Sequence, residues 1–382
     1  MTSTVSLISC DEYNEEKVFN AVKTAVDLVG GIKSFVSAGS RVLIKPNLLS
    51  GKPPENAVTT HPTVLSAVVK LVREAGGIPV VGDSPAVEGN NNFEKFKKVC
   101  EATGILDVVN KLNVELVHFN ASRVEIENPA GKVFKKFTVT GELQKCDSII
   151  NLCKLKTHGL ALITGAVKNM FGTVPGLLKG QYHMRVPHRP EFSQMVVDLY
   201  QAVKPALSIM DAVVGMDGNG PGSGNPRQIG AIIASTDAVA LDSVACQICD
   251  KDPYLLLTCR YGEEQGVGIA DPKKINIMGE QVEKFKVKDF EVLVEDVSRK
   301  PVMRFIINAF REKTTAKPVV DYKKCTKCGT CYESCVPKAI SMPDGYPDIN
   351  YDACIKCYCC HEVCPDGAIS LKKGFLYRLL AK

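Results

Sequence analysis

The sequence predicts a doubly wound α/β domain, with a mainly parallel sheet and a hairpin insertion, followed by a small α+β domain. From Val5 to about Gly279, short apolar runs alternate with longer amphipathic ones, which is the pattern of β-α-β units. Beyond residue 317 the cysteines crowd together. A chain of 382 residues has room for two or three domains. We therefore expect an α/β domain at 1–298, a linker at 299–317 and a second domain at 318–382.

The elements follow in order. Apolar runs predict strands at Val5–Ser9, Arg41–Ile44, Pro79–Val81, Val114–Phe119, Ser148–Leu152, Ala206–Met210 and Gly230–Ala234. Amphipathic runs predict helices at Glu15–Val29, Pro62–Ala75, Phe93–Asn113, Phe192–Val203 and Ala238–Ile248. The turn residues of Asn128–Gly131 lie between two β-prone runs, so Val124–Leu143 is expected to be a hairpin. The linker is basic and contains one expected helix, Val302–Glu312.

Composition excludes several classes of protein. The net charge of +5 is too small to indicate a nucleic-acid-binding protein. No apolar run reaches the roughly 18 residues that a membrane span requires. Acidic residues follow the first apolar run, which argues against a secretory signal, so we expect a cytoplasmic protein. In that compartment thiols stay reduced, and the 16 cysteines therefore point to metal ligation and not to disulfides.

The cysteines of the C-terminal domain form an internal repeat with an offset of 29 residues. Each copy has the spacing C-x2-C-x2-C-x3-C, and Tyr, Lys, Glu, Ala, Ile and Ser positions recur with it. This spacing is typical of two-cluster proteins, in which the fourth cysteine of each run ligates the other cluster. We assign one 4Fe-4S cluster to Cys325, Cys328, Cys331 and Cys364, and a second to Cys354, Cys357, Cys360 and Cys335.

The whole segment resembles bacterial-type two-cluster ferredoxins, and it departs from their pattern at one place. Pro365 follows Cys364 directly, whereas Val336 separates Cys335 from Pro337. The alternative is structural zinc, which prefers pairs of closely spaced cysteines to triplets. Cys359 has Thr330 as its repeat partner and is expected to be a packed thiol. The seven cysteines outside this domain, Cys246 and Cys249 among them, are expected to be buried.

A basic segment follows the expected strand Ser148–Leu152. Between Lys154 and Arg189 there are six Lys or Arg residues and three histidines but no Asp or Glu. Ligands of open α/β sheets bind beyond the carboxyl ends of the strands, so the segment predicts an anion site. The residues expected to contact the anion or transfer protons are Lys156, His158, Lys168, Asn169 and His183. Residues 164–169 are expected to start a helix whose free N–H groups add to the attraction. A solvated basic face is the alternative.

A second loop, Asp211–Arg227, is rich in glycine but matches no dinucleotide or P-loop motif. We expect it to be a cover or a wall over the basic segment, with Asn219 and Gly220 contacting the ligand. A plain flexible loop is the alternative.

Several motifs of the large domain are similar to those of a known family. They are Ile44-Lys45-Pro46-Asn47, Thr60-His61-Pro62, Gly82-Asp83-Ser84-Pro85, Lys156-Thr157-His158, 164–172, Asp211-Ala212, 218–221 and 234–242. Over about residues 40–280 the chain resembles the family catalogued as domain of unknown function 362. Members often carry a two-cluster ferredoxin domain and are labelled iron-sulfur cluster-binding proteins. His158, Lys168 and His183 are also similar to the residues that hold the nickel-pincer cofactor in the lactate racemase family, with His188 competing with His183. This likeness implies an additional metal or metallo-cofactor.

Three functions follow. The leading hypothesis is an oxidoreductase that passes electrons through two 4Fe-4S clusters, between a redox partner protein and an anionic small molecule, with His158 and Lys168 as catalytic residues. The second is an electron carrier, or a module that assembles clusters or metallocofactors, without a substrate of its own. The third is a nickel-pincer-like isomerase or racemase. A defined pocket favours the first, and an open shallow edge favours the second.

Overall fold

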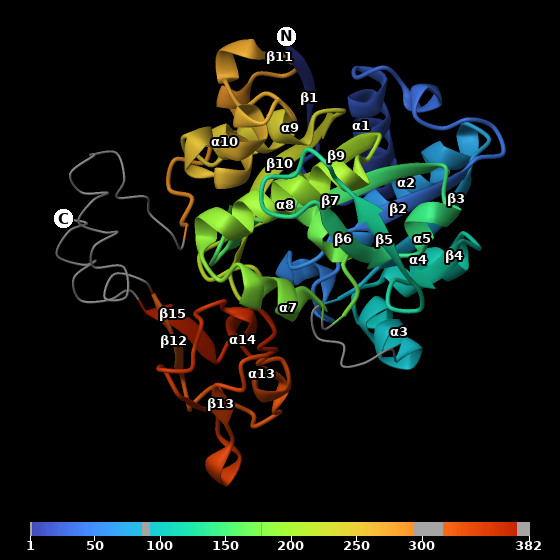
Figure 1. The fold of residues 1–382 in the computed structure, drawn as a ribbon. Coiled ribbons are helices and arrows are strands. Elements are labelled where there is room, and N and C mark those ends of the chain that lie inside the picture. Colours follow the sequence, from blue (N-terminus) through green and yellow to red (C-terminus); the bar gives the residue numbers. More distant parts are fainter. Residues whose placement is uncertain (1, 86–91, 177, 293–315, 373–382) are drawn as a thin grey trace.

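The computed structural model describes residues 2–85, 92–176, 178–292 and 316–372 (Figure 1). Most of the expected linker and its helix Val302–Glu312 lie outside the described residues. A large α/β domain comes first, and a small domain of short strands and helices, here called the C-terminal domain (316–372), lies below α7 in the view of Figure 1.

One mixed, mainly parallel sheet runs through the large domain, in the order β11-β1-β10-β9-β7-β2-β3-β4. Along this path only β10 runs against the other strands, because its pairings with β9 and β1 are antiparallel and all other pairings are parallel. The strands are β1 (Ser3–Ser9), β2 (Arg41–Pro46), β3 (Ile78–Asp83), β4 (Glu115–His118), β7 (Ser148–His158), β9 (Leu207–Asp217), β10 (Asn225–Ser235) and β11 (Ile275–Gly279), with β8 (Leu162–Ile163) paired to β7.

Helices cover both faces of this sheet, as the predicted doubly wound class requires. One apolar core contains the inward faces of the first four helices, and a second core contains those of the later helices. The first group is α1 (Glu15–Asp27), α2 (Pro62–Glu74), α3 (Phe93–Ala102) and α4 (Ile105–Lys111). The second group is α6 (Gly165–Asn169), α7 (Leu178–Arg185), α8 (Arg189–Val203), α9 (Ala238–Ile248) and α10 (Leu257–Glu264). The prediction of a doubly wound α/β domain is confirmed.

Local differences from the prediction have simple causes. The expected helix Phe93–Asn113 is two helices, because Gly104 takes a left-handed conformation with φ of 70° between them. The predicted hairpin is present as β5 (Arg123–Glu127) and β6 (Lys136–Thr140), which pair only with each other. The short helix α5 (Glu142–Lys145) follows it. The strand expected to end at Leu152 continues as β7 to His158, so residues 154–158 at the start of the basic segment lie within the strand and not beyond it.

The C-terminal domain repeats its backbone as well as its sequence. Its elements are β12 (Lys317–Val320), α13 (Thr330–Glu333), β13 (Ile340–Ser341), β14 (Asp348–Ile349), α14 (Cys359–Glu362) and β15 (Ile369–Lys372). Three left-handed positions recur 29 residues apart, at Lys327 and Lys356, Gly329 and Tyr358, and Lys338 and Gly367. The two copies therefore share turn geometry around their cysteines.

Candidate functional site

A cavity of about 130 Å³ lies where the two domains meet. It is surrounded by polar residues at the carboxyl ends of β2 and β3 and by residues of α6, α7 and α14. Its lining includes one cysteine, Cys359, and these polar or charged residues: Lys45, Asn47, Asp83, Thr164, Lys168, Asn169, His183 and Glu362. The cavity fits the rule that ligands of open α/β sheets bind beyond the carboxyl ends of the strands. Neither domain encloses it alone.

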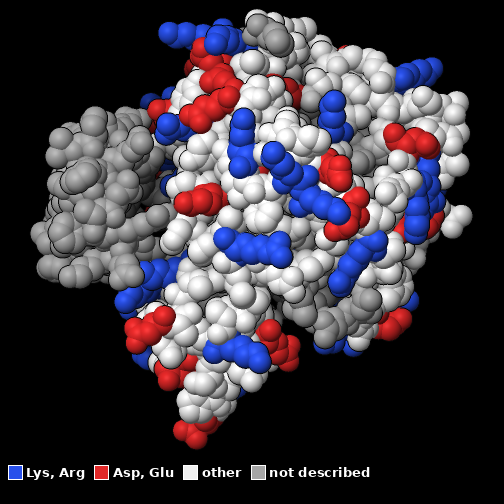
Figure 2. All heavy atoms as spheres, viewed as in Figure 1, with Lys and Arg blue, Asp and Glu red and all other residues white. Residues whose placement is uncertain are grey.

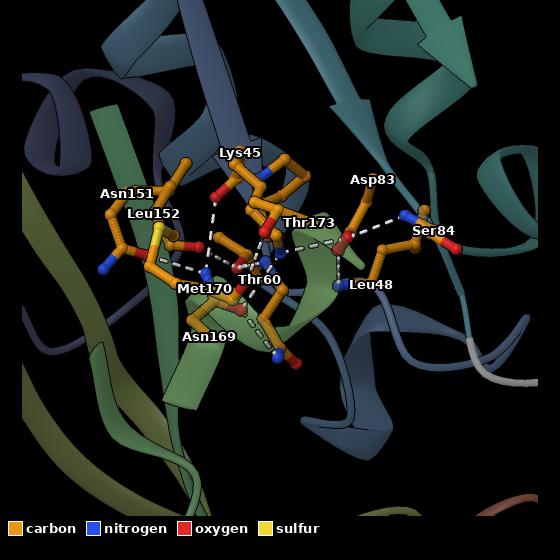
Figure 3. Close-up of polar contacts among 12 residues, drawn as sticks. Lys45, Leu48, Thr60, Asp83, Ser84, Asn151, Leu152, Asn169, Met170 and Thr173 are labelled. Atoms are coloured by element: carbon orange, nitrogen blue, oxygen red, sulfur yellow. Dashed lines mark hydrogen bonds and ion pairs between the residues drawn. The ribbon is translucent and has the colours of Figure 1, made fainter. Parts of the chain in front are cut away.

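A buried ion pair forms the floor of this cavity (Figure 3). The Nζ atom of Lys45 lies 3.0 Å from Oδ1 of Asp83, and both side chains are buried. The other carboxylate oxygen of Asp83 accepts a hydrogen bond from the backbone N–H of Leu48 at 2.9 Å. Burial lowers the pKa of the Lys45 ammonium, and the Asp83 carboxylate opposes that shift. The positive charge of Lys45 and the negative charge of Asp83 neutralise each other, and the pair holds the ends of β2 and β3 together.

The amide of Asn169 joins three strand-end residues beside that pair (Figure 3). Its oxygen accepts from the Asn47 amide at 3.1 Å and from Lys45 at 3.3 Å, while its NH₂ group donates to Asn151 at 2.8 Å. The side chain that the sequence predicted as a ligand contact therefore lines the cavity, with its own hydrogen bonds already made within the protein. Its structural role is to fix α6 against β2 and β7.

Lys168 supplies a positive charge at the cavity wall. It lies on α6, with its Nζ atom 6.0 Å from the centre of the Phe192 ring. Within the described residues no carboxylate lies within ion-pair distance of this ammonium. Burial lowers the pKa of Lys168, and the more distant charge of Glu362 opposes the shift. An anion in the cavity would supply the direct partner that the protein does not.

His158 is held as one tautomer by the backbone. Its Nδ1 atom accepts hydrogen bonds from the N–H groups of Leu160 at 3.0 Å and Ala161 at 3.2 Å. The neutral ring therefore carries its proton on Nε2. Burial lowers the pKa of His158 to about 4, and Lys168 and Lys156 add to the effect. At neutral pH His158 is a hydrogen-bond donor at Nε2 and not a proton acceptor there.

The C-terminal domain brings a carboxylate to this histidine. Oε1 of Glu362, on α14, lies 2.9 Å from Nε2 of His158. The two atoms are not aligned as a hydrogen bond, and both stay without a hydrogen-bond partner in the described part of the chain. Burial alone would raise the pKa of Glu362, but His158, Lys168 and His183 lower it overall. The contact at neutral pH is thus between a carboxylate and a neutral imidazole.

His183 lines the same cavity from α7. Its ring stacks on Phe192 with a centroid separation of 4.4 Å, and burial lowers its pKa to about 4. Its Nδ1 atom is buried and has no hydrogen-bond partner among the described residues. His188 is exposed at the start of α8, so it does not compete with His183 for this place.

Lys156, which the sequence predicts as a ligand contact, does not lie at this cavity. Lys156 is buried, its Nζ atom donates to the carbonyl oxygen of Val58 at 2.6 Å, and it does not line the cavity. Its neighbour Lys154 is also buried and pairs with Asp211 at 2.8 Å. Burial lowers the pKa of Lys156 well below its usual value. Alternation along β7 points both lysines away from the cavity, a consequence of the strand being longer than predicted.

The expected anion site at the start of α6 is occupied by the protein itself. The carboxylate of Asp242, on α9, accepts from the backbone N–H groups of Ala166 at 2.5 Å and Val167 at 3.1 Å. Gly165, with φ of 64°, lets the chain approach this carboxylate. Burial raises the pKa of Asp242 to about 7. The free N–H groups at the start of α6 therefore bind a carboxyl group, as expected, but it belongs to Asp242 of the protein and not to a ligand.

The glycine-rich loop also differs from the prediction. Most of Asp211–Arg227 belongs to β9 and β10, which pair as a hairpin with its tip at 218–224. The tip meets the C-terminal domain, where the carbonyl oxygen of Gly220 lies 3.0 Å from Nε2 of His361. Neither Asn219 nor Gly220 lines the cavity. The tip also packs on Thr157 of the basic segment, whose hydroxyl donates to the carbonyl oxygen of Gly218 at 3.1 Å, so the loop contacts both that segment and the C-terminal domain.

Charge around the basic segment is balanced by acids from elsewhere in the chain. Asp83, Asp211, Asp242 and Glu362 all contact its residues or its surroundings, as described above. On the face shown in Figure 2, Lys and Arg side chains are interspersed with Asp and Glu. Within residues 154–189, Lys154 has a direct ion pair with Asp211, whereas Lys168 has none among the described residues and keeps its charge available to an anion.

The eight repeat cysteines fall into two groups in space. Cys325, Cys328, Cys331 and Cys364 line one hollow, and Cys335, Cys354, Cys357 and Cys360 line another. Each group thus contains three thiols from one copy and the fourth from the other, which is the division that cross-ligation requires. The backbone N–H groups of Ala339 and Ala368 donate to the sulfurs of Cys335 and Cys364, both at 3.2 Å. The residues present therefore fit two 4Fe-4S clusters.

Single-metal sites fit less well. No three His, Cys, Asp or Glu side chains of the described ranges are placed to hold one ion. At His158, a metal on Nε2 would require the proton to move to Nδ1, which faces two backbone N–H donors. This arrangement argues against His158 as the ligand of a nickel-pincer-like cofactor.

Cys359 lies between the interdomain cavity and one of the two hollows that the repeat cysteines line. It lines the interdomain cavity and also the hollow of the Cys335, Cys354, Cys357 and Cys360 group. The repeat pattern of the sequence predicts only a packed thiol at this position. Lys45, Asp83 and Glu362 were also missed, although polar residues at strand ends were a signal for the first two. The sequence does not distinguish Glu362 from its repeat partner Glu333, and only the structure shows that Glu362 lines the cavity whereas Glu333 is exposed.

Two protein-family models match separate parts of the chain. A family model described as domain of unknown function (DUF362) matches residues 42–247, and one described as 4Fe-4S dicluster domain matches residues 317–365. A thylakoid-associated protein of Synechocystis sp. is 37% identical over 268 residues, covering 70% of this chain and 81% of its own. In the described residues no helix has the length and apolar character for crossing a membrane.

Similarity to solved structures is weak. The lactate racemase apoprotein from Thermoanaerobacterium thermosaccharolyticum superimposes with a TM-score of 0.42 and 13% identity. The match covers 64% of this chain and 56% of that one.

Proposed function

Because the chain belongs to the DUF362 family and carries a 4Fe-4S dicluster domain, we propose that it is an oxidoreductase acting on an anionic small molecule in the interdomain cavity. The clusters, held by the two cysteine groups, would exchange electrons with this molecule and with a redox partner protein. The observation that carries the proposal is the position of Cys359, which borders both the cavity and the hollow of the second cysteine group.

Residues of the α/β domain account for binding. His158 does not line the cavity, and its Nε2 lies 2.9 Å from Oε1 of Glu362. The Lys168 ammonium attracts the anion by its charge and donates a charge-assisted hydrogen bond to it. The Lys45–Asp83 pair and the Asn169 amide hold the floor of the site rigid. Closure of the cavity by α14 limits the water around a bound anion, which strengthens both interactions of Lys168 with it.

The alternatives have less support. A carrier or assembly module needs no small-molecule site, whereas this chain builds a cavity from both domains. An isomerase with a metal at His158 conflicts with the backbone donors at Nδ1.

Calorimetric titration under anaerobic conditions tests the proposal, with carboxylates, phosphates and nucleotides as ligands. Lys168→Ala should weaken the binding of the preferred anion by about 1–3 kcal/mol, the range for loss of a charged partner, and leave the iron content unchanged. Arg185→Ala is the control, because Arg185 belongs to the same basic segment but is exposed on α7 and does not line the cavity. If no anion binds the wild type, the carrier function replaces this one.

A further inference from the structure

Buried polar atoms without partners gather around the interdomain cavity. Within the described residues, these include Oδ1 of Asn47, Oγ1 of Thr164, Nδ1 of His183 and Oε1 of Glu362, all from residues that line it. Of these, Oε1 of Glu362 lies 2.9 Å from Nε2 of His158, a residue that does not line the cavity. Buried polar groups in native proteins nearly always have a hydrogen-bond partner, so this group indicates where a ligand's own polar atoms belong.

The chemical nature of these atoms is mixed. The Lys168 ammonium can only donate, whereas Oδ1 of Asn47 and the Glu362 carboxylate can only accept. The amide orientation of Asn47 is fixed, because its NH₂ group donates to Asn169 at 3.1 Å. Thr164 and the neutral ring of His183 can adapt to either role. The site thus offers donors for an anion and, beside them, acceptors that an anion cannot satisfy.

We infer that the ligand of this site carries a hydroxyl or N–H group next to its anionic group, as hydroxy- and amino-carboxylates do, and is not an acceptor-only anion. The inference rests on the proposed function and specifies its substrate class. Water can satisfy Asn47 and Glu362 before binding, so a ligand that displaces this water without offering a donor loses hydrogen bonds. A ligand with a donor group keeps them.

Matched carboxylates test the inference in anaerobic calorimetric titrations of the full-length protein. Butyrate provides the anion alone, and its 2-, 3- and 4-hydroxy derivatives add one hydroxyl donor at successive positions. The fourth compound, 4-aminobutyrate, adds a positively charged ammonium group with three N–H donors. At least one of the donor-bearing compounds should bind about 10- to 100-fold more tightly than butyrate, the range expected for a hydrogen bond to a charged group. Equal or weaker binding of all four would overturn the inference.

A variant of Glu362 tests whether the preference for a donor-bearing ligand comes from a hydrogen bond to this carboxylate. Glu362→Gln keeps the size of the side chain but removes its charge and replaces one acceptor oxygen with a donor. It should reduce the preference for the donor-bearing compound over butyrate at least fivefold, with an unchanged iron content as the check on cluster loading. Glu333→Gln is the matched control, because Glu333 holds the equivalent position of the first copy and is exposed. An unchanged preference in Glu362→Gln would count against the inference.

The two hypotheses fail differently. Butyrate binding that depends on Lys168, without any preference for a donor group, would contradict the inference and leave the proposed function standing. If no carboxylate of this series and no other anion binds, both are wrong.

Discussion

Val336 of the C-terminal domain packs directly against Gly180 of α7. A Cβ atom at position 180 would clash with Cγ2 of Val336. Val336 is the residue that separates Cys335 from Pro337, where the second copy has Cys364 followed directly by Pro365. The departure from the ferredoxin pattern therefore has a structural reason. The extra residue contacts the α/β domain and lines the cavity.

Replacing Gly180 with alanine should weaken the docking of the two domains. In a helix this substitution normally stabilises by roughly 1 kcal/mol, so a fall in thermal stability together with weaker anion binding would come from the clash. Differential scanning calorimetry and ligand titration measure both. Val336→Ala should rescue the Gly180→Ala protein because it removes the clashing methyl groups. A Gly180→Ala protein as stable as the wild type would show that the contact is unimportant.

Cross-ligation of the clusters predicts which one each cysteine supports. Anaerobic wild-type protein should hold about eight irons. Cys364→Ala should damage the cluster of Cys325, Cys328 and Cys331, because Cys364 lines their hollow, and spare the cluster of its own copy. Iron analysis and electron paramagnetic resonance of reduced protein distinguish the two. Cys359→Ala is the control and should retain both clusters. Loss of the other cluster in Cys364→Ala would disprove the assignment.

Asp242 should be essential to the position of Lys168. Asp242→Ala leaves the N–H groups of Ala166 and Val167 without their acceptor, at a cost of about 1–3 kcal/mol each. Asp242→Asn keeps one acceptor oxygen and should lose less stability. Denaturant unfolding ranks the three proteins, and anion titration shows whether α6 still presents Lys168. Equal stability of all three would mean that water replaces the carboxylate.

Acid should destabilise the folded protein through its buried histidines. The pKa of His183 is about 4 when folded, against 6.5 ordinarily, so the unfolded chain binds more protons between these values. The free energy of unfolding should fall as pH drops from about 6.5 to about 4, by up to roughly 1.4 kcal/mol per pH unit for this residue. Above pH 6.5 the contribution is constant. His183→Gln should flatten the dependence in denaturant unfolding, whereas exposed His188→Gln should not change it.

The α/β domain should fold without the clusters. The two cores on the faces of its sheet come almost entirely from residues before 293. A truncated protein ending at Ser298 should be monodisperse and unfold cooperatively, but bind anions weakly because it lacks the closure of the cavity by α14. Circular dichroism and titration measure these properties. An aggregated product would contradict the domain boundary at 298.

Local chemistry made much of this molecule readable from the sequence. The apolar periodicity of Ala238–Ile248 predicted α9 at its observed bounds, because a helix buries residues at a fixed interval. The cysteine spacing predicted the division of thiols between two hollows, because three of the four cysteines that ligate each cluster lie only a few residues apart in the sequence. Lys168 and His183 were found through their local charge.

Only the tertiary structure decided how these pieces meet. Lys156 and Asn219 belong to the same motifs as the site residues, yet the length of β7 and the docking of the β9–β10 tip direct them elsewhere. Glu362 reaches His158 across some 200 residues of sequence, and Asp242 fills the start of α6. Electrostatic partners depend on distance in space and not on separation along the chain, so a segment without acids can fold into a site that contains them.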